Sequence, residues 1–218
     1  MAKDIYVVAH TQSEHHVQKL VGGWYDSELT EFGRLQADAV AERLASILGR
    51  EPEVEIFSSD LRRAAQTAEP VGRRLGRDVV LVPDLRERSA GIAEGKPVSW
   101  LQEREVPPAR DGDRLDHDGG VEGAETTRMF ATRVYRAMAQ LAERACPVQV
   151  VVTHGFAVTH LIAAWIRMPL ESAGWAHFKS SPGGITLLQE DDRFFDRAVM
   201  YLNDREHLSS LAPPPSRP

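Results

Sequence analysis

The sequence predicts an α/β protein with three layers, α/β/α, in which helices cover both faces of a mainly parallel central sheet. Apolar, β-rich runs end at polar or glycine-rich stretches, and helical patterns follow most of them. The runs are apolar on both faces, which is typical of parallel strands that helices bury from two sides. A chain of 218 residues suits one domain with an ample core.

Five short runs rich in β-branched residues are the predicted strands. Val and Ile favour strands because their branched side chains pack well on a pleated surface. Glycines, prolines and charged residues separate the runs, so each strand is bounded by turn or helix signals. The runs are IYVVA (5–9), VEIFS (54–58), VVLV (79–82), VQVVVT (148–153) and ITLLQ (185–189).

Four helical patterns accompany these strands. The first begins after Thr30, a residue type that caps helix N-termini, and ends at Gly49, a residue type common just past a helix. Leu35 and Leu44 belong to its apolar positions, which recur at helical spacing. The other three patterns cover residues 61–75, about 125–144, and a stretch that begins at Gly155.

Two stretches interrupt the alternation of strands and helices. Residues 88–120 mix Pro, Gly, Arg and Asp without sustained periodicity, and we expect an insertion there that covers one edge of the sheet as a lid. Residues 209–218 contain LAPPPSRP, whose prolines cannot donate backbone hydrogen bonds, and we expect a disordered tail. The predicted organisation is a single domain over residues 1–208.

Composition and charge exclude several classes of partner. The net charge is −6 and no long basic block occurs, so binding to nucleic acid or to an anionic membrane has no electrostatic support. The single cysteine, Cys146, excludes an intramolecular disulfide and a cysteine-based metal cluster.

No apolar run approaches the ~20 residues that span a bilayer, and no signal peptide is recognisable, so we expect a cytoplasmic protein. A homodimer stays open, because pattern alone does not separate an exposed apolar patch from core.

Polar side chains with catalytic potential follow four of the predicted strands. Ligands of open α/β sheets bind outside the carboxyl ends of the strands. His10 follows the first strand, and THG (153–155) follows the fourth. SSDLRRAAQTA (58–68) follows the second strand and LRERSAGIAEG (85–95) follows the third. Two histidines, an arginine at a helix start and a glutamate are therefore expected at one edge of the sheet.

These stretches resemble the motifs of the histidine phosphatase superfamily, also called the phosphoglycerate mutase-like family. The resemblance extends to about Leu208. The family carries Arg-His-Gly at the end of its first strand, and His10 lies at the position of the nucleophilic histidine. The resemblance implies that Arg63 is the pocket arginine, Glu87 the proton donor and His154 the second catalytic histidine. Three other stretches match in the family's order: GGWYDSELTEFG (22–33), GAET (123–126) and LNDREHL (202–208).

These residue types suit transfer of a phosphoryl group. A neutral imidazole at His10 can attack through one nitrogen while the other donates to a backbone carbonyl, which fixes the tautomer. Arg63 can bind two phosphate oxygens, and His154, if protonated, would add positive charge. Glu87 would protonate the leaving group and then activate water, which requires a raised pKa. We expect a phosphatase that acts on a small phosphorylated or anionic substrate without a cofactor.

The residues around the nucleophile depart from the family pattern. Ala9 stands where the family has an arginine before the nucleophile, and Thr11 stands where it has a glycine after it. His16 replaces an asparagine six residues after the nucleophile, and Leu20 replaces an arginine ten residues after it. Losing a charged donor to a transferring phosphoryl group costs on the order of a hundredfold in rate unless another group replaces it. The candidates for replacement are His15, His16, Arg88 and Lys179.

Further ligand contacts are expected around the same strand ends. We assign His16, Thr11 and Gly155 to phosphate binding. Arg62, by contrast, points about 100° away from Arg63 around a helix, and we expect it at the surface. We expect no metal site, because the histidines near the nucleophile lack an HExxH spacing and a nearby set of carboxylate ligands.

Three activities stay open at this point. The first is a working phosphatase with a rebuilt pocket. The second is a degenerate member that binds a phosphorylated ligand with little or no turnover, although four intact catalytic positions argue against it. The third is a phosphoglycerate-type mutase, which uses the same phosphohistidine but must exclude water and hold a phosphorylated cofactor. The modest, acid-rich insertion favours hydrolysis over the mutase.

Overall fold

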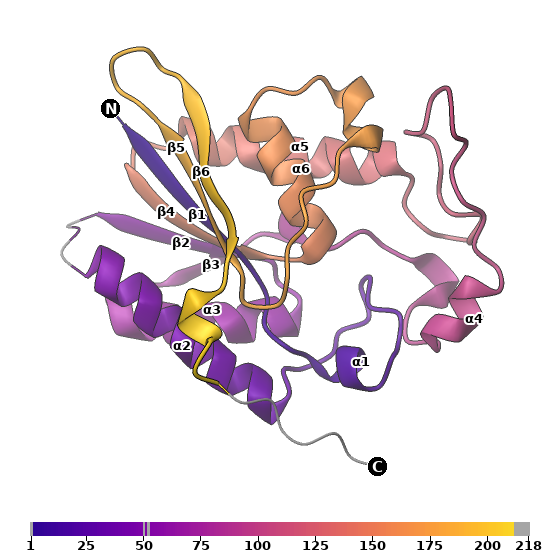
Figure 1. Cartoon of the computed structure of the whole chain (residues 1–218), viewed down its shortest axis with the longest axis horizontal. Helices are drawn as coiled ribbons and strands as arrows, with labels where there is room; N and C mark the ends of the chain where they lie inside the picture. Colours follow the sequence, from indigo (N-terminus) through magenta and orange to yellow (C-terminus); the bar gives the residue numbers. More distant parts are fainter. Residues whose placement is uncertain (1, 50, 52, 212–218) are drawn as a thin grey trace.

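The computed structural model describes residues 2–49, 51 and 53–211, and in this part of the chain a six-stranded sheet lies between two layers of helices (Figure 1). The order across the sheet is β3-β2-β4-β1-β5-β6. The first four of these are parallel, whereas β5 runs antiparallel to β1 and β6 antiparallel to β5. The predicted α/β/α class with a mainly parallel sheet is confirmed. The strands are β1 (Lys3–Ala9), β2 (Val54–Ser58), β3 (Val79–Leu81), β4 (Val148–Thr153), β5 (Ile185–Glu190) and β6 (Arg197–Asp204).

The edge strand β6 has no counterpart among the predicted strands. Val199 and Tyr201 turn toward the protein and are half-buried, while Met200 and Leu202, which alternate with them, face outward and are exposed. Both faces of the run are therefore apolar, although only one of them packs. A half-buried strand is recognised by alternating polar and apolar residues, and this one lacks that alternation.

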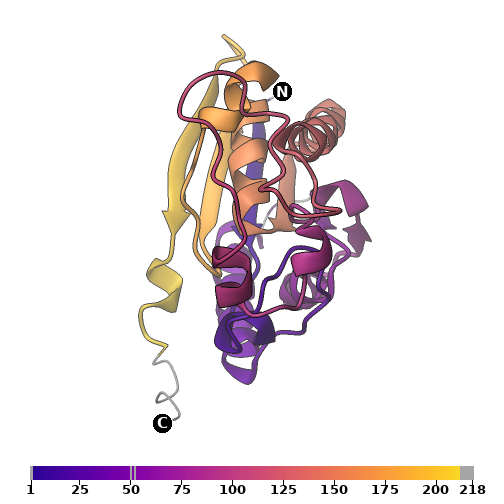
Figure 2. The ribbon, with the colours of Figure 1, turned by 90° about the vertical axis from the view of Figure 1, so that its right-hand side faces the viewer.

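Two pairs of long helices cover the sheet from opposite sides. The helices α2 (Glu31–Leu48) and α3 (Arg62–Leu75) pack on one face, and α5 (Thr127–Glu143) and α6 (Gly155–Trp165) pack on the other (Figure 2). The short helices α1 (Glu14–Val17) and α4 (Val98–Gln102) lie beyond the carboxyl ends of the parallel strands. Four 3₁₀ turns complete the described elements: η1 (Pro83–Leu85), η2 (Gly91–Ala93), η3 (Leu170–Trp175) and η4 (Glu206–Leu208).

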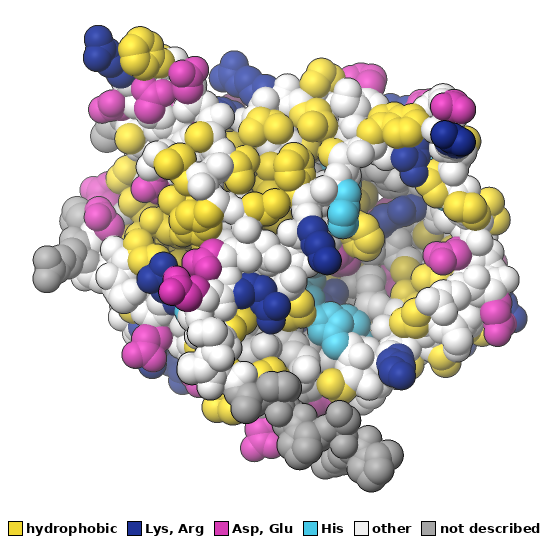
Figure 3. Space-filling model, viewed as in Figure 1, with side chains coloured by type: hydrophobic (Ala, Val, Ile, Leu, Met, Phe, Trp, Pro, Cys, Tyr) yellow, Lys and Arg dark blue, Asp and Glu magenta, His cyan; other side chains and the backbone are white. Residues whose placement is uncertain are grey.

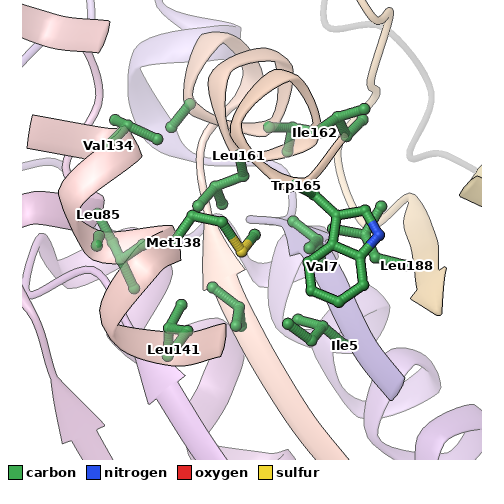
Figure 4. Packing of buried hydrophobic residues seen from close by; sticks show 14 of the residues in the cluster. Ile5, Val7, Leu85, Val134, Met138, Leu141, Leu161, Ile162, Trp165 and Leu188 are labelled. Carbon is green, nitrogen blue, oxygen red and sulfur yellow. The ribbon is translucent and has the colours of Figure 1, made fainter. Parts of the chain in front are cut away.

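The core is divided by the sheet because successive side chains of a strand point to opposite faces. Ile5 and Val7 of β1 join Trp165 and the helices α5 and α6 in one apolar cluster (Figure 4). Tyr6 and Val8 join α2 and α3 in the other. This division fixes the direction of β1, and with it the position of the residues that follow Ala9.

The helix α2 holds the segment after β1 in place. Its N-cap Thr30 accepts a hydrogen bond from Gly33 N at 2.9 Å, and the helix ends at the predicted Gly49. A side chain at Gly33 would overlap the carbonyl group of Gln12, so only glycine allows this close approach. Leu35 differs from its prediction as an apolar-face residue, since it is 54% exposed.

The insertion, residues 88–120, stands over the carboxyl ends of the strands rather than along a sheet edge. It contains η2 and α4 and is fixed by a small apolar cluster in which Val21 meets Ala93 and Val121. The single domain over 1–208 stays a prediction, and most of the expected tail, residues 212–218, lies outside the described residues. Among the helices that the structure describes, none is long and apolar enough to cross a membrane.

Burial in α2 predicts a contrast between two leucines of the same helix. Leu44 is fully buried, so Leu44→Ala should lower the free energy of unfolding by about 2–5 kcal/mol through lost burial and the cavity that remains. The exposed Leu35→Ala should change it by no more than about 0.5 kcal/mol. Urea unfolding of both variants measures the difference. Equal losses at the two positions would contradict the packing of α2.

Candidate active site

The four residues predicted at strand ends meet beside one cavity. His10 follows β1, Arg63 lies in the first turn of α3, Glu87 follows η1, and His154 is the N-cap of α6 after β4. The cavity has a volume of about 530 Å³, and the first three of these residues line it together with Gly155. Figure 3 shows a hollow on this face of the molecule, with histidine side chains at its rim and basic side chains in and around it.

His10 has a defined tautomer, with a proton on one ring nitrogen and a lone pair on the other. Its Nδ1 lies 2.8 Å from Thr11 O and donates to it, because a carbonyl oxygen only accepts. Its Nε2 therefore accepts the hydrogen bond from Arg63 Nε, at 3.2 Å. Burial, with Arg63 and His16 nearby, lowers the pKa of His10 well below 6.5. The ring is neutral, with its reactive lone pair on Nε2.

Arg63 is the central cation of the site. It is 1% exposed, and besides its bond to His10 it donates from Nη1 to Tyr25 O at 2.8 Å and from Nη2 to Gly23 O at 2.7 Å. Burial lowers its pKa to about 10, so the guanidinium stays charged at neutral pH. The neighbouring Arg62 is exposed and pairs with Glu28, in agreement with its predicted surface position.

Glu87 carries a carboxyl group whose pKa is raised by burial. Its Oε1 accepts from Arg88 N at 2.9 Å, and its Oε2 accepts from Phe156 N, in the first turn of α6, at 3.0 Å. These two hydrogen bonds and the charge of Arg63 oppose the shift without cancelling it. The group can therefore be held protonated at a higher pH than an exposed glutamate.

Arg133, on α5, holds the Glu87 segment, and the sequence patterns did not identify it. Its guanidinium donates to the carbonyl oxygens of Asp84, Arg86 and Glu87 at 2.7–3.0 Å. It also forms a bidentate pair with the Glu125 carboxylate, at 2.7 and 2.8 Å. A lone arginine on a helix is normally a surface residue, and the partners of Arg133 lie on other segments, so no local pattern marks it.

His154 is fully buried, with its ring edge-on to that of His10 at a centroid distance of 5.1 Å. Its Nε2 lies 2.8 Å from Ser59 Oγ, and its Nδ1 has no hydrogen-bond partner among the described residues. Burial and the charge of Arg63 lower its pKa well below 6.5. The His154 ring is therefore neutral and does not supply the positive charge that a protonated ring would add.

His15 and His16 form a second wall of the cavity beside His10. The ring of His16 stacks on that of His10 with centroids 5.3 Å apart, and its Nδ1 accepts from Ser13 N at 3.3 Å. His15 Nδ1 lies 2.7 Å from Ser27 Oγ. Burial lowers the pKa of His15 to about 3 and that of His16 to about 4.

The three histidines also bring potential metal ligands together. One nitrogen each of His10, His15 and His16 lie within 4.8 Å of one another, a proximity that sequence spacing did not predict. A metal ion on His10 Nε2 would have to displace the hydrogen bond from Arg63 and sit beside a buried guanidinium. This cluster therefore suits an anion better than a cation.

Two residues near the nucleophile lie away from the cavity. Thr11 is fully buried and donates from Oγ1 to Gly33 O at 2.8 Å. Its position therefore does not support its assignment as a phosphate ligand. Ala9 belongs to the apolar cluster under α5 and α6. Of the candidates for the missing positive charge, His15, His16 and Arg88 line the cavity, and Lys179 does not. Arg88 donates from Nε to Glu125 O at 2.8 Å, which holds its guanidinium at the cavity wall.

Comparisons with known proteins cover nearly the whole chain. The model of the histidine phosphatase superfamily (branch 1) matches residues 5–202. A probable phosphoglycerate mutase of Enterobacter sp. is 33% identical over 168 residues, which cover 76% of this chain and 75% of that protein. A mycobacterial glucosyl-3-phosphoglycerate phosphatase in complex with VO3 has a TM-score of 0.76 at 28% identity, covering 93% of this chain and all of that one. An alpha-ribazole phosphatase from Shigella flexneri, with a TM-score of 0.74 at 24% identity over 92% of this chain and 96% of that one, shares the fold.

The buried histidines predict a loss of stability in acid. Burial lowers the pKa of His10, His15, His154 and His160 in the folded protein, so near pH 6 only the unfolded chain binds protons at these positions. Their contribution is complete well above pH 6.5 and falls below that pH by about 1.4 kcal/mol per pH unit for each histidine. The raised pKa of Glu87 opposes this fall. Urea unfolding between pH 7.5 and 5 measures this slope, and His160→Gln should make it shallower. A flat profile would contradict the burial.

Proposed function

The chain belongs to the histidine phosphatase superfamily, and on that premise we propose that it hydrolyses a small phosphomonoester through a phosphohistidine on His10. The observation that carries the proposal is the pairing of a neutral His10, its proton held on Nδ1 by Thr11 O, with the buried cation of Arg63 at Nε2. The nucleophile that attacks phosphorus and the cation that stabilises the phosphoryl oxygens therefore lie side by side in the cavity.

In the first step His10 Nε2 attacks phosphorus. The N–P bond forms as the ester P–O bond breaks, and the Arg63 Nε–H turns from the lone pair of His10 to a phosphoryl oxygen. The carbonyls of Gly23 and Tyr25 keep the rest of the guanidinium in place, so only the Nε–H contact changes as charge develops on the phosphoryl oxygens. The hydrogen bond to Thr11 O stabilises the imidazole as it becomes cationic.

Glu87 completes both steps by moving one proton. Its raised pKa keeps a proton available for the leaving alkoxide in the first step. In the second step the resulting carboxylate takes a proton from water, whose oxygen forms the new bond to phosphorus as the N–P bond breaks. Its position at the first turn of α6 places it beside Gly155, where the helix N-terminus also favours an anion.

Histidines take over the charge that the missing arginines would supply. A bound phosphate dianion favours the protonated forms of His16 and His154, whose pKa values burial lowers. His154 Nδ1 has no other partner among the described residues and is available to an oxyanion. Arg88 adds a fixed charge at the cavity wall. These groups support activity in a chain with Ala9 and Leu20 at positions where the family has arginine.

Phosphoglyceromutase activity is the main alternative, because relatives such as that of Enterobacter sp. carry the name of a probable phosphoglycerate mutase. Similar structures at 28% identity carry phosphatase names, as in the mycobacterial glucosyl-3-phosphoglycerate phosphatase. The modest, acid-rich insertion, which places Glu105 and Asp118 at this cavity, favours hydrolysis over the mutase. A cytoplasmic location and the open question of a homodimer stay predictions.

Two neighbouring arginines give the sharpest test of the site. Arg63→Lys should lower kcat/KM for p-nitrophenyl phosphate by about a hundredfold or more, because one ammonium group cannot reproduce the fixed geometry with which the guanidinium binds His10, Gly23 and Tyr25. Arg62→Lys, one residue away and exposed, should leave it unchanged, and His10→Ala should abolish turnover.

The same assays decide between the alternatives. Transfer of phosphate between 2- and 3-phosphoglycerate faster than its release would favour the mutase. Binding of vanadate without turnover of any ester in a panel of phosphomonoesters would favour a ligand-binding protein. Equal losses in the two arginine variants would contradict the assignment of Arg63.

A further inference from the structure

A second cavity adjoins the phosphate site. It has a volume of about 640 Å³ and lies between the insertion and η3. This volume is within the range of small-molecule sites, whereas a phosphoryl group alone needs only part of the first cavity. The two cavities share five lining residues, so a ligand can extend from one into the other: Arg88, Glu105, Gly119, Phe156 and His177.

Arg114 brings an unpaired cation to this second cavity. Its guanidinium lies over the ring of Trp175, 4.5 Å from the centroid, and its Nε is buried without a hydrogen-bond partner. The carboxylates beside it in sequence are engaged elsewhere, since Asp113 and Asp116 both pair with Arg128, at 2.9 and 2.7 Å. Among the described residues no carboxylate pairs with Arg114.

The other walls favour an organic anion over a metal ion or a purely apolar ligand. Trp175 and Phe156 are both exposed and present ring surface to the cavity. His160 is buried, and its Nδ1 has no hydrogen-bond partner among the described residues. Glu105 is the one carboxylate residue of the described lining, against the two cations Arg88 and Arg114. Such a cavity can bind a carbon skeleton on its rings and an oxyanion at its cations.

We propose that the second cavity binds the alcohol part of the substrate and that Arg114 binds a second oxyanion there. The substrate is then an extended phosphomonoester whose leaving group carries a carboxylate or a further phosphate, with its carbon skeleton against Trp175. This inference rests on the proposed function, because it takes the cavity at His10 to hold the phosphoryl group that is transferred.

Matched ester pairs test the inference and separate the two oxyanions. Hydrolysis of 3-phosphoglycerate is compared with that of glycerol 3-phosphate, and hydrolysis of fructose 1,6-bisphosphate with that of fructose 6-phosphate. The wild type should prefer the more acidic member of at least one pair by roughly tenfold or more in kcat/KM.

Arg114→Gln should remove that preference, and Arg114→Lys should retain part of it. Neither change should affect p-nitrophenyl phosphate, and Arg110→Gln, an exposed arginine of the same insertion, should behave as wild type.

Several results would overturn the inference. They are equal rates within both pairs, a preference that survives Arg114→Gln, or an equal loss on all substrates including p-nitrophenyl phosphate. The first two leave the proposed function intact as long as His10 is required for turnover. If no ester is hydrolysed, the proposed function fails, and calorimetric binding of the same esters to His10→Ala, with and without Arg114→Gln, still decides the role of Arg114.

Discussion

The arrangement of the site depends on one buried guanidinium. A charged group at 1% exposure is tolerated only when its donors are satisfied, and Arg63 uses three of them on His10, Gly23 and Tyr25. Those bonds join the end of β1, the loop before α2 and the start of α3. The same contacts that make the burial of the charge tolerable therefore set the position of the imidazole, and the apolar clusters on both sides of β1 keep that position rigid.

The charge of Arg63 also determines the protonation of its neighbours. Together with burial it lowers the pKa of His10, His16 and His154, so these imidazoles are neutral around one fixed cation. A neutral His10 is what nucleophilic attack requires. In the mechanism that we propose, these histidines gain protons as a phosphate dianion binds, and their charge offsets the arginine that Ala9 replaces.

The sequence predicts the parts of this site that follow strand ends. His10, Arg63, Glu87 and His154 stand where apolar runs stop, and periodicity alone brings such positions to one edge of a parallel sheet. Contacts between surface-like residues of distant segments are not encoded in any local pattern. Arg133 under the Glu87 loop and Arg114 over Trp175 are examples, because each is a lone arginine whose partners lie on other elements. The edge strand β6 was missed for a related reason, since an apolar run exposed on one side carries no strand periodicity.

Covalent capture of the intermediate tests the central role of His10 most directly. The protein is mixed with p-nitrophenyl phosphate, quenched with alkali within the first turnovers, digested and analysed by mass spectrometry, because phosphohistidine survives alkali and is lost in acid. The peptide that contains His10 should gain the mass of one phosphoryl group, with fragment ions that place it on His10 rather than on His15 or His16. Turnover with no phosphorylated peptide, or with the phosphoryl group on another residue, would contradict nucleophilic catalysis by His10.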